Sequence, residues 1–380
     1  MKSVTSHPPP PQREESSEGS RRAFAATVRL AVPDGQTFSM HAGGSAVIER
    51  SSAMQPTRPP GAQKAGENVS RPTQKAKVAV LMATYEGQHY LAEQLESLSA
   101  QTHSNWAVWA SDDRSKDFTR AILETYRQAW PDGRLSIHSG PADGFVANFL
   151  SLTCKACIEA DYYAYSDQDD IWEADKLARA VRWLDSVPAH IPGIYCSRTR
   201  LVDKSGHEIG LSPLFKKKPS FANSLAQNIG GGNTMVFNNA ARELLREAGD
   251  NIAVVSHDWW AYMLISGCGG KVYYDPEPTL RYRQHGSNLV GMNSTWQARL
   301  KRIQMLRRGR FRNWNNCNIA ALRSMSHRLT PENLEILERF DRARSMSLFP
   351  RLIELRRSGI YRQTLLGNIG LIVAAIFKKL

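Results

Sequence analysis

The feature that most constrains the fold is an alternation of apolar runs and amphipathic segments that begins at residue 77. The apolar runs cover 77–84, 105–111 and 134–138, and a fourth begins at Tyr162. Helical spacing of apolar residues covers 89–102, 117–130 and 145–160. The first run, KVAVLMAT, is apolar at nearly every position, which is typical of a strand covered on both faces. This β-α-β-α-β-α-β order predicts an α/β domain with a mostly parallel sheet flanked by helices.

Polar residues follow three of the predicted strands at the point where each strand ends. These residues are Thr84, Tyr85 and Glu86 after the first strand, Asp112 and Asp113 after the second, and Asp167 to Asp170 after the fourth. In open parallel sheets, ligands bind beyond the carboxyl ends of the strands. We therefore expect these residues to lie together where a nucleotide would bind.

The last of these groups has three carboxylates within four residues, Asp167, Asp169 and Asp170. Such carboxylates repel one another and lose solvation when they are buried. Mg²⁺ or Mn²⁺ would offset both penalties, because these hard cations prefer oxygen ligands. The Asp167-Gln168-Asp169 sequence therefore predicts a metal corner at a strand end. An acidic turn is the alternative, since Asp is common where strands end.

The rest of the chain up to residue 290 continues the alternation less regularly. Helices are predicted at 175–187, 240–248 and from His257 to Ile265, and strands at 193–197, 234–237 and 270–274. A strand-poor stretch is expected after Asp203, and a polar loop at 281–288. Cys154 and Cys157 lie three residues apart on the predicted helix 145–160, which favours a core role over a zinc or redox site.

Composition separates the two ends of the chain from this domain. Residues 1–74 are rich in Pro, Ser, Gly, Arg and Gln and are expected to be mostly disordered. Residues 291–380 hold 18 Lys and Arg against 5 Asp and Glu, which accounts for the whole net charge of +13. This C-terminal region has a helical and basic pattern. Five cysteines, an odd and sparse set, suit reduced thiols in the cytosol.

Six motifs in order resemble the inverting family 2 glycosyltransferases with a GT-A fold, especially a rhamnosyltransferase-like branch. They lie at 83–87 (ATYEG), 111–117 (SDDRSKD), 166–172 (SDQDDIW), 231–234 (GGNT), 257–260 (HDWW) and 282–288 (YRQHGSN). The resemblance covers roughly 77–290. Together with the composition of the two ends, it predicts a disordered extension at 1–74, a glycosyltransferase domain at 75–290 and a basic helical region at 291–380. This sequence departs from the family pattern at Glu86, where the family usually has Asn, and at Arg114, where Gly is common.

The resemblance also implies a role for each matching residue. Asp258 matches the general base, and Asp169 matches the direct metal ligand, with His285 on the metal or the diphosphate. Nucleotide contacts are implied for Thr84, Tyr85, Glu86, Asp112, Asp113 and Asp167. Acceptor or diphosphate contacts are implied for Gly232, Asn233, His257 and Trp259. Local structure offers alternatives: Asp258 as a helix cap, His285 as a loop histidine, and Trp259 as a core residue.

The implied activity is sugar transfer with inversion from a nucleotide-sugar donor, with dTDP-rhamnose favoured, to a cell-surface polysaccharide or lipid-linked acceptor. A nucleotide-sugar-binding protein without catalysis is the alternative. Nucleic-acid binding is disfavoured, because the basic tail carries no recognised motif and the carboxylates would repel phosphate. No stretch is long and apolar enough to span a bilayer. The basic C-terminal region, with its apolar 364–377 segment, predicts peripheral attachment to the cytoplasmic face of the membrane.

Overall fold

The computed structural model describes residues 29–31, 37–39, 75–284 and 309–380. The chain divides into two compact units, residues 1–70 and 71–380. In the first unit, strands β1 (Arg29–Ala31) and β2 (Thr37–Ser39) pair antiparallel. Every other described element belongs to the second unit, which holds the predicted sheet.

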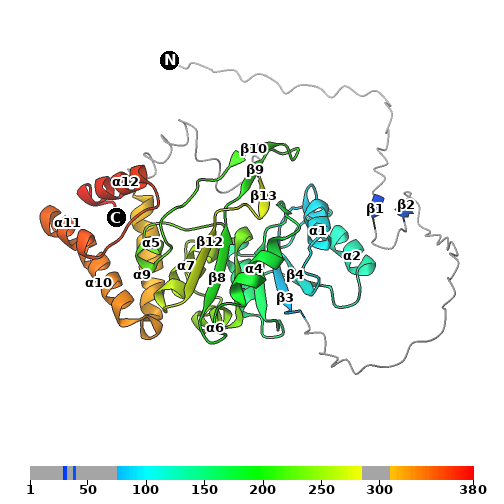
Figure 1. Ribbon diagram of the computed structural model, residues 1–380, viewed down its shortest axis with the longest axis horizontal. Helices are drawn as coiled ribbons and strands as arrows, with labels where there is room; N and C mark the ends of the chain where they lie inside the picture. Colours follow the sequence, from blue (N-terminus) through cyan, green and yellow to red (C-terminus); the bar gives the residue numbers. More distant parts are fainter. Residues whose placement is uncertain (1–28, 32–36, 40–74, 285–308) are drawn as a thin grey trace, which may run out of the picture. The chain divides into compact units, whose positions relative to one another are not determined.

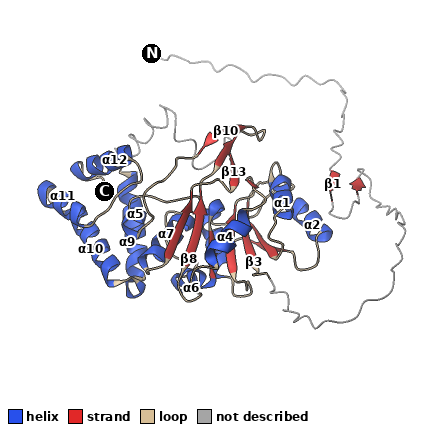
Figure 2. Cartoon of the chain, in the orientation of Figure 1, coloured by secondary structure: helices blue, strands red, loops and turns tan. Residues whose placement is uncertain are grey.

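The second unit is built on a seven-stranded sheet with the order β12-β8-β11-β6-β3-β4-β5 (Figures 1 and 2). Its strands are β3 (Val78–Thr84), β4 (Trp106–Asp112), β5 (Leu135–Ser139), β6 (Tyr162–Ser166), β8 (Gly193–Ser197), β11 (Val236–Asn238) and β12 (Lys271–Asp275). All pairings are parallel except those of β11, which runs antiparallel to β6 and β8. The predicted mostly parallel α/β class is confirmed.

Helices cover this sheet and bury its apolar strands (Figure 2). They are α1 (Leu91–Ser99), α2 (Thr119–Ala129), α3 (Gly144–Cys154), α4 (Lys176–Leu184), α5 (Phe221–Ser224), α6 (Asn239–Ala248) and α7 (His257–Gly267), with a 3-10 turn η1 at Gly232–Thr234. The predicted stripe of Leu91, Leu95 and Leu98 on α1 is fully buried. The central strand β3 is buried from Val78 to Met82, which explains its unbroken apolar run.

The predicted helix 145–160 is too long. Helix α3 ends at Cys154, because the next residue, Lys155, has an extended backbone with φ −63° and ψ 113°. Cys157 is exposed beyond the helix, so the two cysteines do not share a helical face. Burial raises the pKa of the Cys154 thiol to about 11, which leaves it protonated and unreactive near neutral pH.

A second sheet of four short strands was not predicted. Its order is β10-β9-β13-β7, with β7 (Ile171–Trp172), β9 (Arg200–Val202), β10 (Glu208–Leu211) and β13 (Leu280–Arg283). The expectation of a strand-poor stretch after Asp203 is wrong at β10. The expectation of a loop at 281–288 is wrong at β13, because this segment pairs with β7 and β9 from distant parts of the chain.

The described part of the C-terminal region is helical, as predicted. It contains α9 (Arg310–Ser324), the 3-10 turn η2 (Ser326–Arg328), α10 (Pro331–Ser345), α11 (Leu348–Arg357) and α12 (Leu365–Ile376). Leu322, Phe340 and Leu371 join the hydrophobic core of the sheet domain. Asn333 Nδ2 donates to the carbonyls of Ser266 and Gly267 at the end of α7. Among the described residues, no helix combines the length and hydrophobicity needed to cross a membrane.

Candidate active site

The carboxyl ends of β3 and β4 lie side by side. Thr84 pairs with Asp112 in the parallel register, and its Oγ1 donates to Asp112 Oδ1 at 3.1 Å. Ser115 Oγ donates to the same oxygen at 2.6 Å. Strand β6 pairs with the other side of β3, so the turn after Ser166 begins at the same edge of the sheet. The three strand ends highlighted by the sequence therefore meet.

The loop after β3 is held against the loop after β4 through Glu86. The Glu86 backbone N–H donates to Ser115 Oγ at 2.9 Å, and its Oε1 accepts from the Lys116 N–H at 2.8 Å. Glu86 and Arg114 both have a left-handed backbone, with φ of 50° and 66°. The Glu86 carboxylate thus holds the two loops together at the border of the predicted nucleotide site.

Gln168, the middle residue of the Asp-x-Asp sequence, fixes the same loop from the β6 side. Its Nε2 donates to the Tyr85 carbonyl at 2.7 Å, and its Oε1 accepts from the Tyr85 N–H at 2.8 Å. A Cβ at Gly87 would lie 2.3 Å from Oε1, so only glycine fits there. The Tyr85 side chain is 60% exposed beside this anchored backbone. This role of Gln168 could not be predicted, because its partner Tyr85 lies far away in the sequence.

Asp113 organises a third loop, between β5 and α3. Its carboxylate accepts from the backbone N–H groups of Ala142 at 2.5 Å and Gly144 at 3.2 Å. Both Asp112 and Asp113 are buried. A carboxylate has about four lone-pair positions, so each can accept a further hydrogen bond from a ligand. The two residues therefore shape the predicted nucleotide edge by holding its loops.

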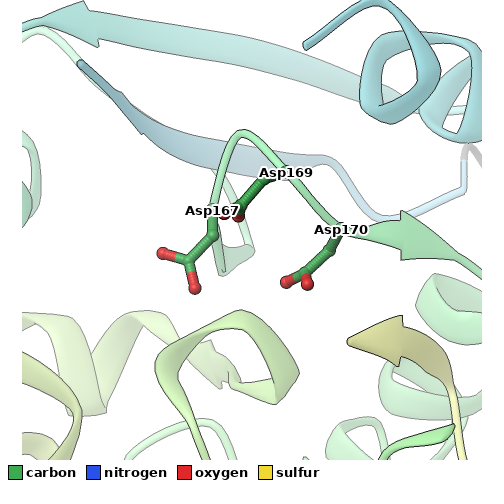
Figure 3. Close-up of side chains that lie close together, drawn as sticks. All are labelled: Asp167, Asp169 and Asp170. Carbon is green, nitrogen blue, oxygen red and sulfur yellow. The ribbon is translucent and has the colours of Figure 1, made fainter. Parts of the chain in front are cut away.

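The turn after β6 brings the side chains of Asp167, Asp169 and Asp170 together (Figure 3). One carboxylate oxygen from each lies within 4.8 Å of the others. In Figure 3 Asp169 points back into the turn, and Asp167 and Asp170 extend below it on either side. Three oxygen ligands at this separation suit a hard divalent cation, which completes its coordination with waters or phosphate oxygens.

The electrostatics of this carboxylate cluster favour a cation. Burial, followed by the charges of Asp169 and Asp258, raises the pKa of Asp167 to about 8. Burial, followed by the charges of Asp169 and Asp167, raises the pKa of Asp170 well above its usual range. The cluster therefore holds more negative charge than its surroundings compensate. Mg²⁺ or Mn²⁺ fits this donor set, because it would neutralise the excess and bind the oxygens directly.

A fully buried lysine, Lys176, is linked to the cluster through Asn233. Lys176, at the start of α4, donates from Nζ to the Asn233 carbonyl at 2.8 Å and lies 4.4 Å from the centre of the Trp172 ring. Asn233 Nδ2 in turn donates to Asp170 Oδ2 at 2.5 Å. Burial lowers the pKa of Lys176 to about 7, although Asp170 and Asp167 oppose this shift. Lys176 is therefore only partly charged near neutral pH and leaves the raised pKa values of Asp167 and Asp170 in place, whereas a bound cation would favour their ionised forms.

Arg283 ties the small sheet to the same turn. Its Nε donates to the Asp169 carbonyl at 3.1 Å, and its Nη2 pairs with Glu93 on α1. Its backbone N–H donates to Asp170 Oδ1 at 3.4 Å. The guanidinium also covers the Tyr90 ring, 4.5 Å from the ring centre. This arginine positions the turn that carries the carboxylate cluster, a role that the sequence interpretation overlooked because it placed Arg283 in a loop.

Asp258 lies in the first turn of α7 and faces η1. Its Oδ2 accepts from the Gly232 N–H at 3.1 Å, and its Oδ1 accepts from the Trp259 N–H at 2.7 Å. Ser256 occupies the N-cap position without a capping side-chain hydrogen bond, and Asp258 accepts from one N–H of the first turn, so its carboxylate fulfils the capping role only in part. Turn η1 links Asp258 to the carboxylate cluster, because the Gly232 N–H donates to Asp258 and the neighbouring Asn233 side chain donates to Asp170.

Two other predicted contact residues, Gly232 and His257, lie next to Asp258. His257 is buried, stacks on Phe149 at 3.9 Å between ring centres, and has no hydrogen-bond partner on either ring nitrogen. Burial lowers its pKa to about 4, so the ring is neutral. A Cβ at Gly232 would lie 2.4 Å from His257 Nε2, which makes glycine necessary beside Asp258.

Trp259 lies in the core on the opposite side of α7. Its indole Nε1 donates to the Ser224 carbonyl at 2.7 Å, and its ring packs edge-on against Trp314. This is the core role that the sequence analysis offered as the alternative to an acceptor or diphosphate contact. The predicted metal or diphosphate contact His285 lies outside the described residues.

Comparison with known proteins decides the family. The sequence profile of Glycosyl transferase family 2 matches residues 79–245. The dTDP-rhamnosyl transferase RfbG of Shigella flexneri is 30% identical over 239 residues, which cover 60% of this chain and 79% of RfbG. This chain belongs to glycosyltransferase family 2. The family resemblance predicted from the six motifs is confirmed, and the protein is a glycosyltransferase.

Two further relatives within this comparison are more distant. WfgD of Escherichia coli, a UDP-Glc:alpha-D-GlcNAc-diphosphoundecaprenol beta-1,3-glucosyltransferase, is 30% identical over 101 residues, which span 26% of this chain and 38% of WfgD. The mannosyltransferase PcManGT of Pyrobaculum calidifontis, solved with GDP-Man and Mn²⁺, is 16% identical with a TM-score of 0.45. That match covers 81% of this chain and 87% of PcManGT.

Proposed function

We propose that this family 2 glycosyltransferase transfers rhamnose from dTDP-rhamnose to an acceptor hydroxyl with inversion of configuration. The observation that carries the proposal is that turn η1 joins Asp258, through the Gly232 N–H, to the cluster of Asp167, Asp169 and Asp170, through the Asn233 side chain. The choice of donor is supported by the similarity to RfbG, which is named a dTDP-rhamnosyl transferase.

The nucleotide is proposed to bind over the ends of β3 and β4. Tyr85 offers an exposed ring beside a backbone that Gln168 fixes, and Thr84 and Glu86 border the same loop. Asp112 and Asp113 would hold the nucleobase or sugar of the nucleotide with the lone pairs that their loop contacts leave free. Asp167 would lie between the nucleotide and the metal.

Asp169 is proposed as the direct metal ligand, with Asp167 and Asp170 beside it and His285 as a further contact. Mg²⁺ or Mn²⁺ bound there would supply positive charge to the departing nucleoside diphosphate. Lys176 and Arg283 hold the protein side of this corner through Asn233 and the Asp169 carbonyl. The chain thus keeps the three carboxylates together before any substrate arrives.

Asp258 is proposed to act as the general base. As the acceptor oxygen attacks the anomeric carbon, its proton passes to an Asp258 oxygen, and the bond from that carbon to the diphosphate breaks. A single displacement with one base and no enzyme nucleophile inverts the anomeric centre. Gly232 and His257 would border the acceptor or the diphosphate, and the Gly232 N–H holds the Asp258 carboxylate in place.

The acceptor is proposed to be a cell-surface polysaccharide or a lipid-linked glycan at the cytoplasmic face of the membrane. The similarity to WfgD, whose name includes a diphosphoundecaprenol-linked acceptor, supports a lipid-linked substrate.

A donor screen tests the proposal. The purified protein is incubated with dTDP-rhamnose and with UDP- and GDP-sugars, in Mg²⁺ or Mn²⁺, and released nucleoside diphosphate is measured. We expect the highest turnover with dTDP-rhamnose and a lipid-linked acceptor extract. Tight donor binding with no turnover of any donor would instead support a catalytically inactive binding protein.

A further inference from the structure

Helix α12 exposes a continuous apolar face to solvent. Its outer face, as used below, consists of Leu365, Leu366, Ile369, Ile372, Ile376 and Phe377, each between 43% and 78% exposed. Residues 365, 369, 372 and 376 follow helical spacing and form one stripe. Six large apolar side chains exposed together on one short helix are unusual for a protein surface that faces only water.

The outer face belongs to a helix that is firmly held in the fold. The opposite face buries Leu371, Ala374 and Ala375 in the core. Thr364 caps the helix by accepting from the Gly367 N–H at 3.0 Å, and the buried Arg351 of α11 donates to the Ala375 carbonyl at 2.6 Å. Because both ends are anchored, the six side chains remain directed outward.

The neighbouring helix extends the apolar character of this end of the unit. Helix α11 packs against α12 (Figure 1) and exposes Phe349 at 78% and Ile353 at 52%. A helix with one buried face and one exposed apolar face is typical of a binding surface for an apolar partner that covers the whole exposed face.

Charge identifies the partner as an anionic lipid surface. Residues 355–380 contain no acidic residue. Their five basic residues are Arg356, Arg357, Arg362, Lys378 and Lys379. Lys378 and Lys379 directly follow Phe377 at the end of the outer face. Cations beside exposed apolar side chains complement the phosphates and acyl chains of an anionic leaflet. At about 1.5 Å per residue, twelve residues cannot cross a hydrocarbon core of roughly 30 Å, so the helix would lie in the plane of the interface.

We infer that the outer face of α12, supported by Phe349 and Ile353 of α11, docks the enzyme on an anionic membrane surface. The inference deepens the proposed function, since such docking would bring the enzyme to a lipid-linked acceptor. The docking surface itself does not depend on the identity of the donor.

Vesicle flotation tests the inference with the full chain. Binding is measured to phosphatidylglycerol-containing and to phosphatidylcholine vesicles, at low and high salt. We expect binding to the anionic vesicles that weakens in high salt, and at least tenfold weaker binding for Leu365→Ser/Leu366→Ser/Ile369→Ser. Lys378→Gln/Lys379→Gln should weaken anionic binding roughly tenfold or more at low salt. The matched control Ile209→Ser/Leu211→Ser, which removes exposed apolar side chains of β10, should bind like the parent.

Several outcomes would overturn docking. Equal or negligible binding to both vesicle types would do so, as would equal losses in the α12 and β10 variants. Sedimentation velocity without lipid provides a second readout: a dimer that the triple serine variant abolishes would assign the face to a second copy of the chain. Turnover of dTDP-rhamnose in detergent separates the two proposals, because the α12 variants should retain it, whereas failure of the proposed function would leave the parent inactive too.

Discussion

Replacement of Lys176 by methionine should destabilise the protein far more without metal than with it. The Lys176 side chain is fully buried, and its ammonium donates to Asn233 at 2.8 Å, while Asn233 donates to Asp170. Methionine keeps a side chain of similar length beside the Trp172 ring, but it removes a buried cation that reaches the carboxylate cluster through Asn233. The substitution therefore tests whether the folded protein is stabilised by a positive charge beside the carboxylate cluster.

The size of the effect follows from two contributions. Removal of one partner from a buried charge cluster costs about 3–5 kcal/mol. The part of this loss that comes from the unpaired Asn233 carbonyl is about 1–3 kcal/mol, and a metal cannot restore it. A bound cation replaces the charge but not the hydrogen bond. We therefore expect a loss of about 3–5 kcal/mol in chelator that falls to about 1–3 kcal/mol in saturating Mn²⁺.

Urea unfolding measures both values in excess chelator and in saturating Mn²⁺. Arg351→Met is the matched control, since Arg351 is also a buried cation but donates only to the helix carbonyls of Ala375 and Met346. Its loss of unfolding free energy should be the same with and without metal. A Lys176→Met loss below about 1 kcal/mol, or one that metal leaves unchanged, would refute the reasoning.

Four further predictions follow from the site and the chain. Asp169→Asn should cut turnover by orders of magnitude, and full activity of the parent in excess chelator would contradict a metal role. Asp258→Asn should bind donor normally but lose transfer by roughly 10²–10⁴-fold; normal turnover would exclude it as the base. Burial raises the pKa of Asp167 to about 8, and a cation binds only the deprotonated carboxylate. The affinity for Mn²⁺, measured by spin-resonance titration, should therefore rise from about pH 6 to about pH 8. An affinity that does not change with pH would contradict this. A chain that starts at Arg71 should fold and keep its activity, and an inactive product beside an active full chain would contradict the expected dispensability of 1–74.

The large sheet could be predicted because its strands carry their own signal. Val78 to Met82 and Tyr163 to Ser166 are buried on both faces, so their apolar runs are visible in the sequence. The small sheet carried no such signal: β7 has two residues, and Glu208, Ile209 and Leu211 of β10 are exposed. Its strands exist because distant segments pair, which local periodicity does not reveal.

The carboxylates of the site could also be predicted, whereas the residues that hold them could not. Asp167, Asp169 and Asp258 lie in recognisable motifs. Lys176 and Gln168 act through Asn233 and Tyr85, which are far away in the sequence.

The two departures from the family pattern have a common structural setting. Glu86 and Arg114 both adopt positive φ, where the Asn and Gly expected from the resemblance are favoured over other residues. Their loops are nevertheless closed, because the Glu86 carboxylate accepts from the Lys116 N–H and Ser115 bonds to Asp112. The two departures therefore change the side chains at this edge of the sheet, while hydrogen bonds still hold the loops after β3 and β4 together.

The stereochemistry of the product tests the central proposal most directly. A donor of known anomeric configuration is turned over with metal and acceptor, and the configuration of the new glycosidic bond is read from the one-bond carbon–proton coupling at the anomeric centre. A single displacement with Asp258 as the base predicts a product of opposite configuration to the donor. A product that retains the donor configuration would require an enzyme nucleophile or a different mechanism and would contradict the proposal.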